Sequence, residues 1–187
     1  ITLYAVWNAG SNTVTYDSQS GTSVASGSFT TGTALTLAAA PTRTGYTFAG
    51  WFVAASGGSA LVSGYSPTNT SSFTLYAQWT GTSNNVTYSL NGGTGSLPTQ
   101  ASVLTAGTFT TAASSGVTKT GYSFGGWSDG SSTTAASTSY TMGAVAITLT
   151  AVWNAGSNTV TYDSQSGTSV SPGSFTTGTA LTLAAAP

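Results

Sequence analysis

The sequence ITLYAVWNAGSNTVTYDSQSGTSVASGSFTTGTALTLAAAP, residues 1–41, recurs as residues 147–187 with three differences. The differing pairs are Tyr4 and Thr150, Ala25 and Ser171, and Ser26 and Pro172. A repeat this close indicates that one structural unit is copied along the chain. The first copy starts, and the second stops, partway through that unit, so we expect the chain to be part of a longer array.

Segments that end in tryptophan give the length of the unit. ITLYAVW ends at Trp7, FTLYAQW at Trp79 and ITLTAVW at Trp153, so the first two tryptophans are 72 positions apart and the last two are 74 positions apart. Short loops rich in Gly, Ser and Asn follow each of them and are typical of unit boundaries. We therefore expect the last strand of a preceding repeat (1–8), repeat module A (9–80), repeat module B (81–154) and the first half of a further module A (155–187).

Within a unit, apolar and polar residues alternate with a period of two, which is typical of a half-buried strand. In residues 1–7, for example, Ile1, Leu3, Ala5 and Trp7 share one face. The same pattern predicts strands at 13–16, 33–37, 45–51, 73–79, 85–88, 147–153, 159–162 and 179–183. A turn signal at Asn91-Gly92 predicts a hairpin, and its counterpart DSQSG (17–21) reads as a longer polar loop. The fold class expected is mainly β, with four or five short strands per module and little or no helix.

The few large side chains of each small module must form its core. We expect the structural core to use the recurring aromatic residues Trp7, Tyr46, Phe48, Trp51, Trp79, Tyr122, Phe124, Trp127 and Trp153. For module A, Val14, Tyr16, Phe29, Leu35, Leu37 and Leu75 complete the predicted core.

Composition excludes several classes of function. The chain has 2 basic and 3 acidic residues, no His and no Cys. Two cations cannot neutralise several phosphates, so nucleic-acid binding is excluded. No apolar run reaches the ~18 residues of a membrane span. Acid–base groups are too sparse to predict a catalytic residue, a cofactor site or a metal site.

Three motifs in module B, in this order, resemble the Listeria–Bacteroides repeat, the family that includes the internalin B-repeat. They are VTYSLNGGTG (86–95), TKTGYSFGGW (118–127) and ITLTAVW (147–153), with VTYDSQSGTS (14–23), TRTGYTFAGW (42–51) and FTLYAQW (73–79) as the parallel series. The resemblance implies small β-grasp-like modules arranged in tandem in secreted or surface-anchored bacterial proteins, where they act as stalks, spacers or parts of adhesins without catalysis. Such modules often carry many charged residues, and this chain departs from that pattern.

Two hypotheses for function remain open. The first is a non-catalytic structural array at the bacterial cell surface, in contact with neighbouring repeats and with copies of itself in a filament. The second is a module that binds host or environmental glycans through exposed aromatic rings, repeated for avidity.

Arg43 and Lys119 fit either a ligand-binding cation or a stem lying over Tyr46 or Trp51. Asn69 and Asn85 head N-glycosylation sequons.

Overall fold

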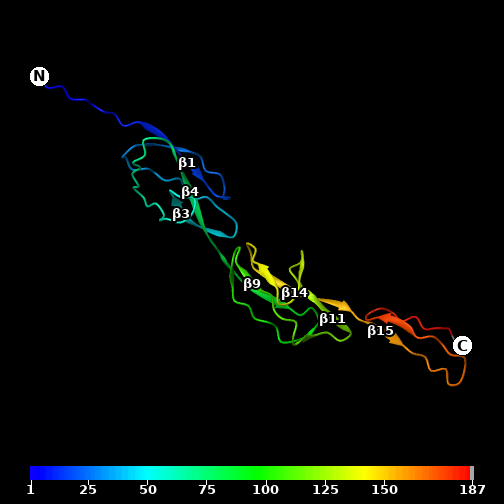
Figure 1. Ribbon diagram of the computed structural model, residues 1–187. Helices are drawn as coiled ribbons and strands as arrows, with labels where there is room; N and C mark the ends of the chain where they lie inside the picture. The colour runs from blue at the N-terminus through cyan, green and yellow to red at the C-terminus, as the bar shows by residue number, and fades with distance from the viewer. Residues whose placement is uncertain (186–187) are drawn as a thin grey trace. The chain divides into compact units, whose positions relative to one another are not determined.

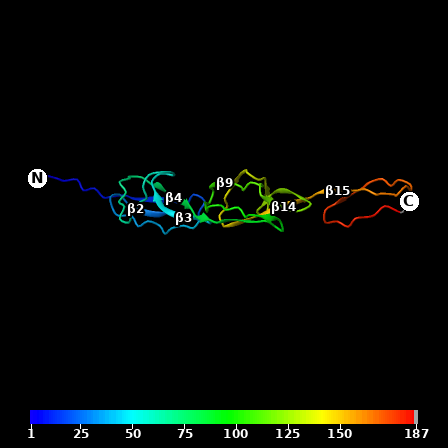
Figure 2. The ribbon, with the colours of Figure 1, turned by 90° about the horizontal axis from the view of Figure 1, so that it is seen from below.

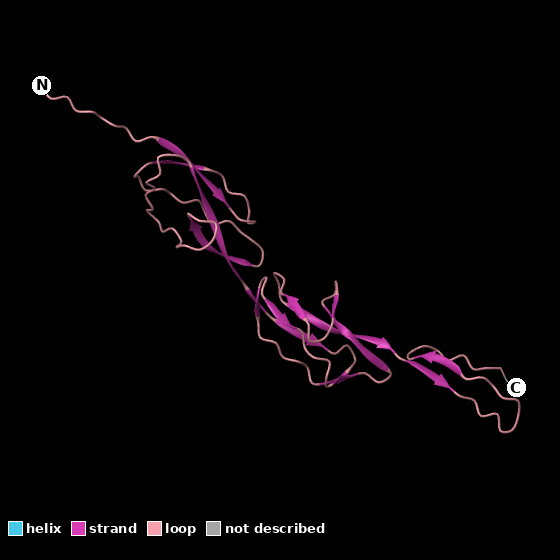
Figure 3. Ribbon diagram, viewed as in Figure 1, coloured by secondary structure: helices cyan, strands magenta, loops and turns pink. Residues whose placement is uncertain are grey.

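The computed structural model describes residues 1–185 and contains strands, turns and loops, with no helix in that range (Figure 3). The chain forms two compact units, residues 1–83 with 104–106 and residues 84–103 with 107–187. Each unit contains one four-stranded mixed sheet. The prediction of mainly β modules in tandem is confirmed.

The sheet of module A has the strand order β2-β1-β4-β3. Its strands are β1 (Ser11–Asp17), β2 (Gly27–Thr30), β3 (Tyr46–Phe52) and β4 (Phe73–Gly81). The two central strands, β1 and β4, are parallel, and each has an antiparallel strand on its outer side. This order, in which the first and last strands of the module are parallel neighbours, is β-grasp-like. Both views show β3 alongside β4 (Figures 1 and 2).

Module B shares the three-strand core of this sheet but has the order β12-β11-β14-β6, with its fourth strand beside β11 instead of beside β6. Its strands are β6 (Val86–Ser89), β11 (Tyr122–Ser128), β12 (Thr133–Thr134) and β14 (Ile147–Ala155). Again the first and last of these strands, β6 and β14, are parallel neighbours, but here β6 lies at the edge of the sheet. Three shorter pairs are antiparallel: β7 (Thr94–Gly95) with β10 (Val117–Thr118), β9 (Thr108–Thr110) with β13 (Ser139–Thr141), and β15 (Ser157–Val160) with β16 (Gly173–Thr176). The two-residue strands β5 (Ser83–Asn84) and β8 (Val103–Leu104) form a further two-stranded sheet.

Alternation along the central strands places one face of each sheet in the core. In β4, Leu75 and Ala77 are fully buried, and Leu149 and Ala151 occupy the same places in β14. Val14 of β1 is also fully buried in module A. The period-two pattern therefore gives the correct inward face for both last strands.

A β-bulge in β3 places Trp51 on the opposite face from the one that strict alternation predicts. Strict alternation puts Phe48 and Trp51 on opposite faces, but the register of β3 shifts between Phe48 and Gly50. Gly50 adopts a φ of 135°, which favours glycine, and the extra residue turns Trp51 back toward the core. The Phe48 and Trp51 rings then pack with centroids 5.4 Å apart. The same shift occurs in β11 between Phe124 and Gly126.

The predicted strand at residues 1–7 and the burial of Trp7 are wrong for this structure. Residues 1–10 form no strand (Figure 1), and Trp7 is 89% exposed. The nearly identical β14 lies between β6 and β11, both of which precede it in the sequence. Among the described residues, no strand pairs with residues 1–7, and their apolar face stays uncovered.

The predicted strand at 33–37 is also not formed, although Leu35 is buried there. Its counterpart in module B, β9, pairs with β13, and the Met142 N–H extends that ladder by donating to the Gly107 carbonyl. Pro67 occupies the place of Met142 and has no N–H to donate. The backbone N–H groups of Gly32 and Leu35 donate across to the carbonyls of Pro67 and Tyr65 without forming a regular ladder. No strand forms at 179–183 either.

Replacing Leu149 with Ala should lower the free energy of unfolding by about 2–5 kcal/mol, because it opens a cavity in a fully closed part of the core. Urea denaturation followed by tryptophan fluorescence measures this. The matched control is Leu97→Ala at an exposed site, which should change stability by less than about 0.5 kcal/mol. Equal effects of the two changes would contradict the assigned core.

Candidate functional site

A tight turn with two left-handed residues follows the first strand of each module. In module B, Asn91 and Gly92 have φ of 51° and 76°, and the Gly93 N–H donates to the Leu90 carbonyl over 2.9 Å. The turn predicted at Asn91-Gly92 is therefore present. The predicted hairpin is not, because β6 pairs with β14 while β7 pairs with β10.

The counterpart in module A is the same four-residue turn rather than a longer loop. Gln19 and Ser20 have φ of 45° and 70°, and the Gly21 N–H donates to the Ser18 carbonyl over 3.0 Å. The Asp17 carboxylate accepts the Gln19 N–H over 2.9 Å, which supports this strained backbone. A third copy of the turn occurs at Gln165 and Ser166.

The tryptophan of each last strand holds this turn. The Trp79 indole N–H donates to the Ser18 carbonyl over 3.0 Å, and Trp153 donates to Leu90 over 2.8 Å. A Cβ at Gly21 would lie 2.6 Å from the Trp79 ring, so this position requires glycine. The turn and the C-terminal strand of the module are thereby locked together.

The single cation of each module also contacts this turn. The Arg43 guanidinium lies 4.0 Å from the centre of the Tyr46 ring and donates to the Gln19 carbonyl over 3.2 Å. Lys119 lies 4.8 Å from the Tyr122 ring centre and donates to the Asn91 carbonyl over 3.2 Å. The predicted stem over Tyr46 is confirmed. The cation therefore ties the turn to the start of the strand that carries the tyrosine.

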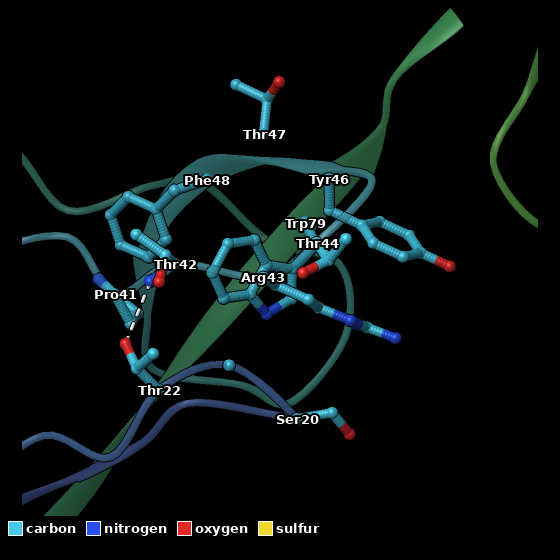
Figure 4. A pocket seen from close by; sticks show the side chains of 11 residues that line it. Ser20, Thr22, Pro41, Thr42, Arg43, Thr44, Tyr46, Thr47, Phe48 and Trp79 are labelled. Atoms are coloured by element: carbon cyan, nitrogen blue, oxygen red, sulfur yellow. Dashed lines mark hydrogen bonds between the residues drawn. The ribbon is translucent and has the colours of Figure 1, made fainter. Parts of the chain in front are cut away.

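In module A, these residues border a pocket of about 690 Å³ (Figure 4). Arg43, Tyr46, Phe48 and Trp79 line it, together with hydroxyl-bearing residues and Pro41. A smaller hollow of about 230 Å³ shares Arg43, Tyr46 and Trp79 with it and extends to Gln78. Both hollows are open to solvent and have no carboxylate in their lining, so they offer a cation, aromatic edges and hydroxyl groups to a ligand.

The second tryptophan of each module lies in the core. Trp51 is 2% exposed and Trp127 is fully buried. Their indole N–H groups donate to the carbonyls of Ala38 and Ala112, both over 2.9 Å. The Ala112 N–H donates in turn to the Tyr88 hydroxyl, and burial raises the pKa of Tyr88. Residues 38–40 form a loop, which the hydrogen bond from Trp51 to the Ala38 carbonyl holds in place.

The other residues expected in the structural core fall into two groups. Phe48, Trp79, Phe124 and Trp153 are half-buried and pack against the two core clusters. Tyr46 and Tyr122 are half-buried but lie under the cations, outside those clusters. The aromatic residues thus contribute partly to packing and partly to the turn-locking arrangement.

Both sequon asparagines are exposed. The Asn69 carbonyl accepts the Thr31 hydroxyl over 2.7 Å, and the Asn85 side chain accepts the Ser102 hydroxyl over 2.7 Å. An N-linked glycan is attached to Nδ2, so neither hydrogen bond uses the atom that glycosylation would modify.

A polar cluster that the sequence did not reveal lies in module B. Asp129 lies in a turn, where its carboxylate accepts the N–H groups of Ser131 and Ser132. It also accepts the Tyr140 hydroxyl over 2.7 Å. Hydrogen bonds from Ser132, Tyr140 and Ser131 lower the pKa of Asp129 to about 2. Burial and the Asp129 carboxylate raise the pKa of Tyr140 to about 12.

Among the described residues, no three acidic, His or Cys side chains gather in a group that could hold a metal ion. Within the same residues, no helix is long and apolar enough to cross a membrane.

Arg43→Ala should lower the free energy of unfolding by about 1 kcal/mol, because it removes a cation–π contact and one hydrogen bond. Arg43→Lys should retain most of that stability, since Lys119 makes both contacts in module B. Thermal or urea denaturation of the three proteins measures this. If the Ala variant is as stable as the parent, the cation does not hold the turn.

Acid should weaken module B through Asp129. Its pKa is lower in the folded protein than the ordinary 3.8, so its contribution is complete above about pH 4 and is lost as the pH falls toward about 2. Asp129→Asn should remove this part of the pH dependence, and Asp163→Asn is the matched control. Urea midpoints measured between pH 5 and pH 2 test it. Parallel curves for the parent and the Asp129 variant would contradict it.

The sequence of the two complete modules matches one family model. The model is that of the Listeria-Bacteroides repeat domain, and it matches residues 13–78 and 85–152. These matches start within or beside β1 and β6 and end within β4 and β14, so each covers one four-stranded sheet. No curated protein and no solved structure matches the chain. With two copies of the model covering more than half of its length, the chain belongs to the Listeria-Bacteroides repeat domain family.

Proposed function

We propose that the chain is a non-catalytic structural repeat array of a bacterial extracellular protein, serving as a cell-surface stalk, adhesin segment or filament building block. Tandem repeats of this family are typical of bacterial surface proteins, and the family is generally non-catalytic. The proposed repeat units are residues 9–80 and 81–154, with a further unit from 155 onward. Neighbouring repeats are their first partners.

The observation that carries this proposal is the use of aromatic residues within each module. Trp51 and Trp127 are buried, while Trp79 and Trp153 donate their N–H groups to turns of their own module. Binding by avidity would favour a contiguous exposed row of rings. Aromatic rings that are used within their own module instead support a structural role, in which the array provides length and surface.

The sparse charge of the chain also suits an extracellular location. A chain with 2 basic and 3 acidic residues has little charge to keep copies apart. We propose that glycans at exposed sites, with Asn69 and Asn85 as candidates, contribute that separation.

A second candidate function, glycan binding, is favoured by one feature of module A. The two hollows that share Arg43, Tyr46 and Trp79 would suit an acidic sugar, with its carboxylate on the guanidinium and its rings against the aromatic edges. Retention of the chain on immobilised polygalacturonate, lost in Arg43→Ala, would support this candidate. The matched control is Lys119→Ala in module B.

Antibodies raised against the purified chain should label intact, unpermeabilised cells of the producing bacterium, because an array of this kind is exposed outside the cell. Fluorescence of intact and permeabilised cells gives the measurement, with a cytoplasmic enzyme as the negative control. Labelling that requires permeabilisation would contradict the proposed location and with it the structural role.

A further inference from the structure

We propose that each module is a mechanical clamp that resists stretching of the chain, an inference that rests on the structural role proposed above. A stalk or filament transmits force along its backbone. Where the chain enters and leaves each module therefore decides how that force loads its hydrogen bonds.

In module A, the chain enters at the start of β1 and leaves at the end of β4. These strands are parallel neighbours, with Val14 opposite Phe73 and Asp17 opposite Tyr76. Parallel strands have their entry and exit at opposite ends, so a pull on the two ends slides one strand along the other. The evenly spaced hydrogen bonds of a parallel pair then share the load and must break together.

Module B has the same geometry. β6 begins the module and β14 ends it, and they pair in parallel from Val86 with Ile147 to Ser89 with Thr150. In module A the parallel pair forms the centre of the sheet, with one further strand on each side, whereas in module B the pair has its further strands on the β14 side only. An extending force therefore meets a shear-loaded pair in each complete module.

Side-chain hydrogen bonds reinforce the same pair at equivalent positions. The hydroxyls of Thr15 and Thr74 lie 2.7 Å apart across β1 and β4, and those of Thr87 and Thr148 lie 2.8 Å apart across β6 and β14. The Thr15 hydroxyl also lies 3.2 Å from the Phe73 carbonyl. On the other face, fully buried Val14 and Leu75 keep water from the backbone bonds.

The paired strands β15 and β16 provide an internal contrast. They are antiparallel, with Ser157 opposite Thr176, so the chain enters and leaves at the same end. A pull at that end opens such a hairpin one hydrogen bond at a time. Among the described residues, β15 has no parallel neighbour that would place it under shear.

Pulling one module in two directions tests the clamp. The 187-residue chain contains no cysteine, so two introduced cysteines define the attachment points in it. Ser11→Cys with Thr80→Cys loads β1 and β4 in shear, whereas Ser11→Cys with Ser71→Cys peels them apart from one end. All three positions are exposed. At equal loading rate, the shear pair should rupture at roughly twice the force of the peeling pair or more, because its bonds break together.

Removing the hydroxyl pair provides the second measurement. In the shear geometry, Thr15→Val with Thr74→Val should lower the rupture force, whereas Thr36→Val, an exposed change outside the parallel pair, should not. Equal rupture forces in the shear and peeling geometries would overturn the clamp. That result would leave the structural role standing, because labelling of intact cells tests the role without reference to force.

Discussion

Parallel pairing between the first and last strands of a module is the interaction on which the rest of the structure depends. It brings together residues about 60 positions apart, such as Val14 and Phe73 or Val86 and Ile147. Closing a loop of that length costs chain entropy that local contacts cannot offset. The buried faces of β4 and β14 provide the compensation, because Leu75 and Leu149 lose all contact with water.

The turn after the first strand keeps its geometry in both modules although its sequence differs. The turn after the first strand is Gln-Ser in module A and Asn-Gly in module B, with nearly the same φ values. Its three supports are kept: a tryptophan N–H, a cation and a glycine under the indole. By contrast, Pro67 in place of Met142 changes a ladder, because a missing N–H cannot be compensated by packing.

The sequence pattern predicted the fold where a feature depends on one strand alone. Alternation gave the inward faces of β4 and β14, and spaced motifs indicated the family. It failed where a feature depends on a distant partner. Residues 1–7 pair with no strand among the described residues, residues 33–37 face Pro67, and the Asp129 carboxylate accepts a hydrogen bond from Tyr140, 11 residues away. The bulges at Gly50 and Gly126 were hidden because a single extra residue reverses the alternation. The cation over Tyr46 could be predicted because both lie in one short segment.

The last strand of a module is ordered only when it lies between two strands that precede it in the sequence, as β14 lies between β6 and β11. Two segments of this chain test that dependence directly. ITLYAVW at 1–7 and ITLTAVW at 147–153 have almost the same sequence, but only the second is paired with a strand on each side. Tyr4 in place of Thr150 distinguishes their peptides by mass. Amide hydrogen exchange followed by mass spectrometry should show protection at 147–153 and exchange near the unprotected rate at 1–7. Equal exchange in the two segments would contradict the account.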